Sequence, residues 1–273
     1  MKNIILYLIS LFVLLNNCSV STPGNSITGE TITKIKVLNN NEVLITDKID
    51  VTGKIFDTEK KEYGYNILLK YRITEKKKYF LKNYNKYIKT ILVKNNKIII
   101  EFFPQGQILL DLENNKEEQI MLPFTLEDEY DFTKDTNKYL HTRITSNYAL
   151  MEYNKANEQD NIIIESIQPI YIIKYNNDET KIAYVSNGDL FVTNIDGTGN
   201  LKLTSNYNIN EICWEENNDY IIFLTENREI YRIRQDGLEL IKLKEINVNL
   251  SISDLYYNKI AYIDNLEVKI IYF

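Results

Sequence analysis

The sequence is poor in the residues that most often carry metal or covalent chemistry. Its 273 residues include one histidine and two cysteines, which excludes a zinc site built from Cys and His ligands. Four prolines and nine glycines leave little material for long flexible linkers. A formal charge of -6 argues against a dedicated nucleic-acid binder, which usually carries a strong positive field. We therefore expect no bound metal, no other cofactor and no nucleic-acid partner.

The composition is that of a globular protein. A hydrophobic content of 44% is too high for an intrinsically disordered chain. A chain of this length can bury about 75% of its unfolded surface, so a core alone can stabilise it without disulfides. We expect a single large domain and a monomer.

The N-terminus has the pattern of an export signal. Lys2 precedes an apolar run of twelve residues, 4–15, interrupted by one serine. Such a run is shorter than the roughly 20 residues that span a bilayer and is typical of a signal-peptide core. The following Leu15-Asn16-Asn17-Cys18 resembles a bacterial lipoprotein signal, with Asn17 where the pattern prefers Gly, Ala or Ser. The resemblance implies that residues 1–17 are removed and that Cys18 carries a lipid.

Ordinary secretion is the alternative, with cleavage near Ser19-Val20-Ser21 and an incidental Cys18. Under lipidation, the polar residues 18–30 form a short tether between the membrane anchor and the domain. Cys213 is then the one remaining thiol and cannot form an internal disulfide. Its neighbours Ile212 and Trp214 predict a buried, inert position.

The body of the chain repeats itself. Lys181-Ile182-Ala183-Tyr184-Val185 recurs as Lys259-Ile260-Ala261-Tyr262-Ile263, with Tyr220-Ile221-Ile222-Phe223-Leu224 midway between them. Weaker copies precede these, so that six units have corresponding strands starting near residues 42, 97, 138, 181, 220 and 259. Their usual spacing is about 40 residues, and the first interval carries an insertion at about residues 50–63.

Each unit contains four short strands, most clearly in residues 168–204. Extended segments at 170–174, 181–186, 189–195 and 201–204 are separated by turn residues, among them Asn187-Gly188 and Asp196-Gly197-Thr198-Gly199. Asn-Gly favours a tight hairpin turn. The second segment is apolar on both faces, as expected for a sheet covered by a neighbour on each side. Four strands per 40 residues predict a propeller blade, and six units predict an all-β, six-bladed β-propeller of four-stranded antiparallel blades over residues 31–273.

The last unit, Leu250 to Phe273, supplies three strands. A missing fourth strand would leave an exposed edge. We expect part of residues 26–38 to close the ring by pairing beside the strand at 266–273.

Two segments resemble the repeats of TolB-type propellers. Residues 214–223, Trp-Glu-Glu-Asn-Asn-Asp-Tyr-Ile-Ile-Phe, are similar to the family's Trp-Ser-Pro-Asp-Gly-Lys-x-Ile-Ala-Phe segment, and residues 188–199 to its Asp-Ile-Tyr-Val-Met-Asn-x-Asp-Gly-Ser-Gly stretch. The resemblance is strongest over residues 170–245. TolB-type proteins carry an additional N-terminal α/β domain, and we expect this chain to resemble their propeller alone. The resemblance implies a periplasmic scaffold linked to the outer membrane.

No catalytic set can be assembled from the sequence. His141 falls on the second strand of the third unit, where a packed or hydrogen-bonded strand residue is the expected role. The chain contains no Gly-x-Ser-x-Gly elbow, Walker loop or Gly-x-Gly-x-x-Gly motif, so those classes of hydrolase and nucleotide-binding site are excluded. We expect no catalytic residue.

Three charged segments have alternative interpretations. The lysines at 76–78, 82, 86 and 89 alternate with aromatic residues and form either a contact for an anionic surface or, as we expect, a solvated strand–turn–strand. Glu127-Asp128-Glu129 with Asp131 could offer oxygens to Ca²⁺ but lacks the spacing of a calcium loop. Asp196-Gly197-Thr198-Gly199-Asn200 is expected to be a hairpin turn rather than a calcium loop.

Three functions fit these observations. The first, which we favour, is a non-enzymatic, lipid-anchored envelope scaffold that binds another envelope protein or a peptide. The second is an enzyme with carboxylates at the channel mouth acting on a glycan or peptide, and the third is a surface-exposed adhesin. The sequence does not identify the partner or the binding face.

Overall fold

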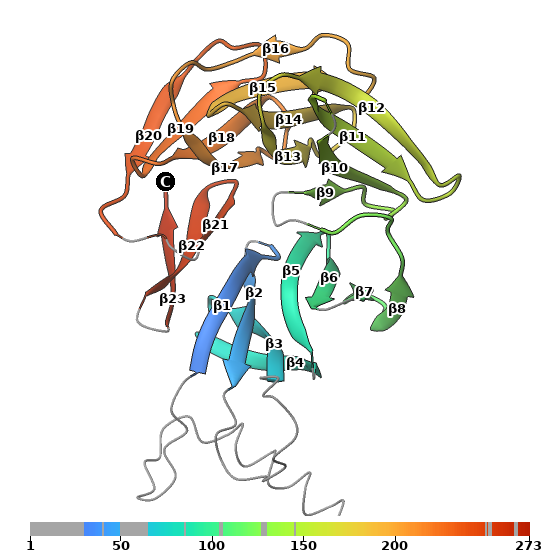
Figure 1. The fold of residues 1–273 in the computed structure, drawn as a ribbon. Helices are drawn as coiled ribbons and strands as arrows, with labels where there is room; N and C mark the ends of the chain where they lie inside the picture. Colours follow the sequence, from blue (N-terminus) through green and yellow to red (C-terminus); the bar gives the residue numbers. More distant parts are fainter. Residues whose placement is uncertain are drawn as a thin grey trace, which may run out of the picture.

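The structure is a computed structural model that describes residues 30–39, 41–49, 65–84, 86–103, 106–126, 130–144, 146–248, 250, 253–264 and 267–273. In these residues the chain forms 23 β-strands in six antiparallel sheets (Figure 1). The same residues include no helix long and apolar enough to cross a membrane. The all-β propeller expected from the repeats is confirmed.

Each sheet takes its strands in chain order and is one blade. The first blade contains β1 (Glu30–Val37), β2 (Glu42–Ile49), β3 (Tyr65–Arg72) and β4 (Lys77–Tyr84). The second contains β5 (Tyr87–Lys94), β6 (Lys97–Phe103), β7 (Gln107–Asp111) and β8 (Lys116–Ile120). The third contains β9 (Asp131–Phe132), β10 (Lys138–Ile144), β11 (Tyr148–Asn154) and β12 (Gln159–Ser166).

The C-terminal half repeats this plan. The fourth blade contains β13 (Ile170–Tyr175), β14 (Lys181–Ser186), β15 (Asp189–Asn194) and β16 (Leu201–Lys202). The fifth contains β17 (Ile209–Trp214), β18 (Tyr220–Thr225), β19 (Glu229–Arg234) and β20 (Ile241–Glu245). The sixth contains the three strands β21 (Ser253–Tyr256), β22 (Lys259–Asp264) and β23 (Glu267–Tyr272).

The six repeat copies are the second strands of the six blades. β2, β6, β10, β14, β18 and β22 begin at residues 42, 97, 138, 181, 220 and 259, as the repeat predicts. The insertion predicted near residues 50–63 falls between β2 and β3, outside the described residues. Turn chemistry also agrees with the prediction: Asn187 and Gly188 have φ of 51° and 81°, which allows the two-residue turn that joins Ser186 to its partner Asp189.

Apolar side chains fill the spaces between neighbouring blades. One cluster combines Leu92 and Ile99 of the second blade with Phe132 and Tyr139 of the third. Another combines Ala183 of the fourth blade with Ile221 of the fifth. Because both faces of a blade are covered in this way, β14 and β18 are buried from their second residue to their last. This packing explains why their sequences do not alternate.

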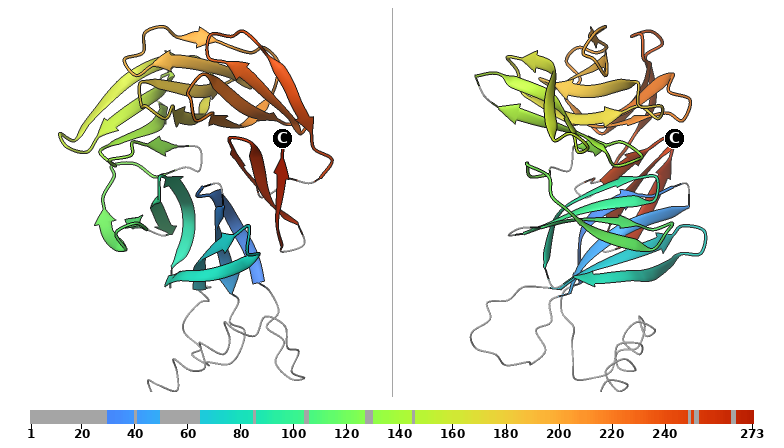
Figure 2. Two further views of the ribbon diagram at one scale, coloured as in Figure 1. Left: turned by 180° about the vertical axis from the view of Figure 1, so that it is seen from behind. Right: turned by 90° about the vertical axis from the view of Figure 1, so that its right-hand side faces the viewer.

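The ring closes differently from our expectation. Residues 30–37 form β1, which pairs with β2 in the first blade, whereas β23 pairs with β22 alone among the described strands. Residues 26–29 lie outside the described residues. The closing contact is face to face: Val37 and Val43 of the first blade pack with Ala261 of the sixth. Figures 1 and 2 show these two blades side by side.

Candidate functional site

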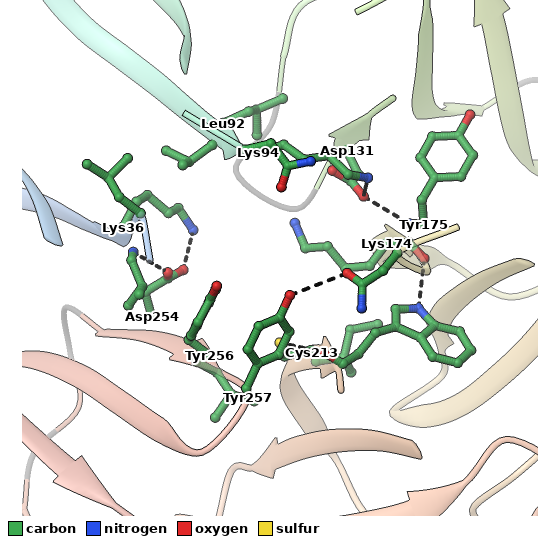
Figure 3. Close-up of a pocket in the computed structure, with 18 of the residues that line it drawn as sticks. Lys36, Leu92, Lys94, Asp131, Lys174, Tyr175, Cys213, Asp254, Tyr256 and Tyr257 are labelled. Atoms are coloured by element: carbon green, nitrogen blue, oxygen red, sulfur yellow. Dashed lines mark hydrogen bonds and ion pairs between the residues drawn. The ribbon is translucent and has the colours of Figure 1, made fainter. Parts of the chain in front are cut away.

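A cavity of about 160 Å³ lies where the six blades meet. We call it the channel cavity. All six innermost strands, β1, β5, β9, β13, β17 and β21, contribute to its wall, as do residues of the turns that follow β5, β9, β13 and β21. Figure 3 shows its side chains converging from several blades. A central, concave, partly polar position of this kind is where a propeller offers a binding site.

Six lining residues occupy the same position in their blades. Each lies opposite the third residue of the second strand in the antiparallel register of its own blade. Lys36 lies opposite Leu44 in the first blade, and Asp254 lies opposite Ala261 in the sixth. The remaining four show the same register. In blade order the set, which we call the axial ring, is Lys36, Leu92, Asp131, Lys174, Cys213 and Asp254.

The axial ring repeats after three blades. Lysine, an apolar or sulfur side chain and aspartate occur in blades one to three and again in blades four to six. Three blades of six are half a turn, so the ring has an approximate twofold arrangement of charge. Each lysine consequently lies in the blade that follows a blade with an aspartate.

Both aspartates of the ring bind the next blade. Asp254 Oδ2 accepts a hydrogen bond of 2.7 Å from the backbone N–H of Val37, and its Oδ1 lies 3.0 Å from Lys36 Nζ. In the same way, Asp131 Oδ2 accepts a hydrogen bond of 2.8 Å from the backbone N–H of Tyr175. Asp131 also pairs with Lys94 Nζ at 3.1 Å. Charged acceptors make strong hydrogen bonds, so these carboxylates hold neighbouring blades together.

Lys174 lies within the channel cavity between these pairs. Its Nζ donates to the backbone carbonyl of Tyr130 at 3.2 Å. Burial lowers the pKa of this amine, while the nearby Asp131 carboxylate acts in the opposite direction. An ammonium in such a place is poorly hydrated and interacts strongly with any negative charge that approaches it.

The cavity is bordered on one side by the turns that join first and second strands. We call this side of the propeller the mouth face. Its turns are linked across blades: Asn177 donates from its backbone to Asn218 Oδ1 at 2.6 Å and from Nδ2 to the carbonyl of Glu215 at 2.7 Å. Tyr257 Oη donates to Asn177 Oδ1 at 3.4 Å (Figure 3). These bonds fix the fourth, fifth and sixth blades relative to one another at the mouth.

Cys213 is the ring member of the fifth blade. It is half-buried and lines the channel cavity, a position less enclosed than its apolar neighbours in the sequence predict. Burial nevertheless raises its pKa to about 12, and its thiol donates to the carbonyl of Trp214 at 3.3 Å. A thiol of such high pKa is a poor nucleophile.

Solved structures share this architecture. TolB from Acinetobacter baumannii aligns with a TM-score of 0.56 at 13% identity, over 76% of this chain and 57% of that chain. A putative TolB from Agrobacterium tumefaciens aligns with a TM-score of 0.55 at 13% identity, over 72% of this chain and 76% of that one. The chain has a TolB-like propeller fold. It spans little more than half the length of the Acinetobacter TolB.

The TolB-like fold is shared with an enzyme. An oligogalacturonate lyase in complex with manganese aligns with a TM-score of 0.52 at 11% identity, over 81% of this chain and 67% of the lyase. No protein-family model and no curated protein sequence matches the chain. At these identities the structural likeness establishes the fold, and function has to be argued from the site.

The expected role of His141 in this TolB-like propeller is confirmed. The residue is buried on β10, its Nε2 lies 2.7 Å from Asp160 Oδ1, and its ring stacks on Phe124 with a centroid separation of 4.0 Å. It is a packed, hydrogen-bonded strand residue outside the channel cavity.

The lysine-rich segment is spread over β4, β5 and the turns beside them. Lys82 pairs with Glu117 at 2.6 Å and Lys89 with Glu101 at 3.1 Å. These contacts fit the expected strand–turn–strand, with acidic side chains from other strands balancing part of its charge.

The two acidic segments differ in outcome. Residues 127–129 lie outside the described residues, whereas Asp131 belongs to the axial ring. Asp196 lies within a hairpin turn as expected, since Gly197 N–H donates to the carbonyl of Asn194 at 2.9 Å. Across the described residues, no three His, Cys, Asp or Glu side chains are grouped so that they could hold a metal.

The axial ring is the part of the site that the sequence interpretation missed. Its members precede the second strand of their blades by five to seven residues, because the turns between the strands differ in length. A search for polar residues at that offset would have found the two lysines and two aspartates. Cys18 and the predicted tether up to residue 29 lie outside the described residues.

Proposed function

We propose that the protein is a non-enzymatic binding scaffold of the bacterial cell envelope that engages a protein or peptide at its mouth face. The observation that carries this proposal is the mouth itself: turns cross-linked by hydrogen bonds surround a channel cavity with room for one inserted side chain. A preorganised, concave surface binds a partner without a large cost in ordering its own loops.

The chemistry of the cavity also supports binding rather than catalysis. Asp131 and Asp254 each accept a backbone N–H and a lysine from other blades. Carboxylate oxygens that already accept these hydrogen bonds are poorly placed to exchange a proton with a substrate.

An envelope location follows from the N-terminal signal proposed above. Removal of residues 1–17 and lipidation of Cys18 would leave the propeller on a membrane through its anchor alone. The likeness to TolB structures supports the same location. A Cys18→Ala variant should lose incorporation of labelled fatty acid and move from the membrane to the soluble fraction. Retention in the membrane fraction after this change would contradict the anchor.

Site-specific photo-crosslinking tests the proposed face. A photoreactive residue at Asn95 or Asn217, both exposed on the mouth face, should give a discrete adduct in intact cells. The matched positions are Asn187 and Asn227, exposed on the opposite face, where we expect no such adduct. Mass spectrometry of the adduct then identifies the partner. Equal adducts from both faces, or adducts from the opposite face alone, would reject the mouth as the docking surface.

A propeller enzyme is the second candidate, because a lyase shares the fold over 81% of this chain. This candidate predicts that the purified protein cleaves an acidic oligosaccharide, measured by the ultraviolet absorbance of the unsaturated product. Single substitutions of Asp131 or Asp254 should then abolish turnover in protein that remains folded. We expect no turnover, and turnover that depends on either residue would overturn the scaffold proposal.

A further inference from the structure

The charges that line the channel cavity do not balance. Lys36, Lys94 and Lys174 reach it from three blades, together with Lys134 at the mouth, whereas the acidic lining residues are Asp131 and Asp254. This local excess of positive charge occurs in a chain whose formal charge is -6. The wall of the cavity therefore has the opposite sign to the molecule as a whole.

Two of the lysines have a carboxylate partner within the cavity wall. Lys36 pairs with Asp254 at 3.0 Å and Lys94 with Asp131 at 3.1 Å. Lys174 differs, because its hydrogen bond goes to the neutral carbonyl of Tyr130. A half-buried ammonium whose hydrogen-bonding partner is neutral is costly to keep charged; burial lowers its pKa, although Asp131 and Asp254 act in the opposite direction. A bound anion would remove that cost.

The size of the cavity limits what that anion can be. A volume of about 160 Å³ corresponds to roughly five water molecules at ~30 Å³ each, which is the size of a single side chain. Tyr256, Tyr257 and Trp214 give the wall an apolar and aromatic component that suits a short carbon chain bearing a charge. Of the two lining lysines that exceed the aspartates, Lys134 is exposed at the mouth and Lys174 lies deeper in the cavity, so a singly charged carboxylate suits the interior better than a dianionic phosphate.

We propose that the channel cavity binds one carboxylate group of a docked peptide, with Lys174 as its counter-ion. The carboxylate is either an Asp or Glu side chain or a C-terminus inserted through the mouth face. This inference rests on the proposed function and specifies the chemistry of the partner. Lys94 and Lys36 remain bound to their own aspartates, so the ring stays closed while the cavity is filled.

Small probes separate the two sources of the carboxylate. N-acetylglutamate α-amide represents an acidic side chain, N-acetylalanine represents a C-terminus, and N-acetylglutamine amide is the neutral control. Ligand-observed NMR titrations at constant ionic strength measure their affinities for the propeller. We expect one or both acids to bind at least tenfold more tightly than the neutral control. The stronger of the two acids identifies the source.

Lys174→Met tests the role of the counter-ion. Methionine keeps most of the length and the apolar stem of the side chain but removes the charge, so the variant should fold with an unchanged or higher melting temperature. We expect at least a tenfold loss of affinity for the acidic probe and no change for the neutral one. Lys174→Arg should retain most of the affinity. Lys269→Met is the matched control, because Lys269 lies outside the channel cavity on the outermost strand of the sixth blade, β23, and pairs with Glu267.

The results separate this inference from the proposed function. If no acid binds better than the neutral control, or if wild type and Lys174→Met bind the acid equally, the carboxylate site is wrong. The comparison of the acids with the neutral control uses wild type alone, so it remains a valid test even if the Lys174→Met variant does not fold. If either of these negative results were accompanied by a mouth-face adduct in cells, the carboxylate site would be rejected and the scaffold proposal would still be supported. Carboxylate binding without any mouth-face adduct would support the site and reject the scaffold.

Discussion

Asp254 accepts the backbone N–H of Val37 at 2.7 Å across 217 residues of sequence. This bond joins the sixth blade to the first, where no described strand is shared between them. The propeller is therefore closed by side-chain bonds and by apolar packing between whole sheets. An equivalent bond between Asp131 and the N–H of Tyr175 joins the third blade to the fourth, half a turn away. The closing contact is therefore of the same type as a contact between two blades that are consecutive in the sequence.

We expect Asp254→Ala to destabilise the propeller by about 2–3 kcal/mol, because it removes the acceptor of a part-buried N–H and the ion pair with Lys36. For a domain of this size the melting temperature should fall by roughly 5–10 °C. Asp254→Asn keeps an acceptor oxygen and should cost about 1 kcal/mol. Thermal unfolding followed by circular dichroism measures both. Equal losses for the two variants would show that the hydrogen bond to Val37 contributes nothing.

Gly197→Ala should be more damaging than Gly237→Ala. Both glycines have a positive φ, 81° and 86°, which costs an alanine about 1–2 kcal/mol. A Cβ on Gly197 would also collide with the backbone carbonyl of Ile163 in the third blade, whereas one on Gly237 would make an ordinary contact with Leu203. Denaturant unfolding of the two variants tests the difference. Similar midpoints would mean that the third and fourth blades can separate at this point without cost.

Glu211 should make the fold less stable as the pH rises. Burial raises the pKa of this carboxyl above its ordinary 4.5, with Asp254 acting in the same direction, while Ser253 donates a hydrogen bond to it. The folded state thus binds the proton more tightly than the unfolded state. This contribution to stability is complete below pH 4.5 and is lost as the pH rises through the higher folded-state pKa.

Glu211→Gln removes that titration. The unfolding free energy of the variant relative to wild type should therefore increase from pH 5 to pH 8, whatever its offset at pH 5. Glu42 provides a control of opposite sign, because its pKa is lowered. Burial acts to raise the pKa of this carboxyl, but hydrogen bonds from Lys70, Asn39 and Arg72 lower it by more. Its contribution is present above pH 4.5 and is lost in acid. A constant difference between Glu211→Gln and wild type across this range would contradict the prediction.

Cys213 should react slowly with alkylating reagents in the folded protein. Burial raises the thiol pKa from 9.0 to about 12, which lowers the thiolate fraction about 10³-fold at neutral pH, and the thiolate is the reactive form. In a Cys18→Ser variant, Cys213 is the sole cysteine, so mass spectrometry of iodoacetamide labelling reports it alone. Denatured protein serves as the reference. Comparable rates in folded and denatured protein would refute the shifted pKa.

The fold could be predicted from the sequence because its strongest signal is repeated. The second strands share a buried apolar stretch near their starts, which is longest in β14 and β18, and their starting residues were located correctly. Turns could be predicted from local chemistry as well, because Asn187-Gly188 adopts backbone angles that few other residue pairs tolerate. Such local requirements are visible without knowing what lies across the ring.

The axial ring could not be predicted in the same way. Lys174 and Asp131 are ordinary charged residues in the sequence, and their meaning depends on contacts with other blades. Ring closure was predicted wrongly for residues 30–37 because the extended pattern of β1 does not say which strand it pairs with. β1 pairs with the next strand in the chain, β2, and the first blade meets the sixth through a tertiary contact of Val37 and Val43 with Ala261.

The half-turn repetition of lysine and aspartate in the axial ring has an electrostatic consequence. Asp254 and Lys36 form one couple of opposite charges, and Asp131 and Lys174 form another on the opposite side of the axis. In both couples the lysine follows the aspartate in the same direction around the ring. The transverse dipoles of these two couples therefore oppose each other, and their fields largely cancel at the centre. The net attraction for an entering anion therefore comes from the surplus lysine charge and not from either couple.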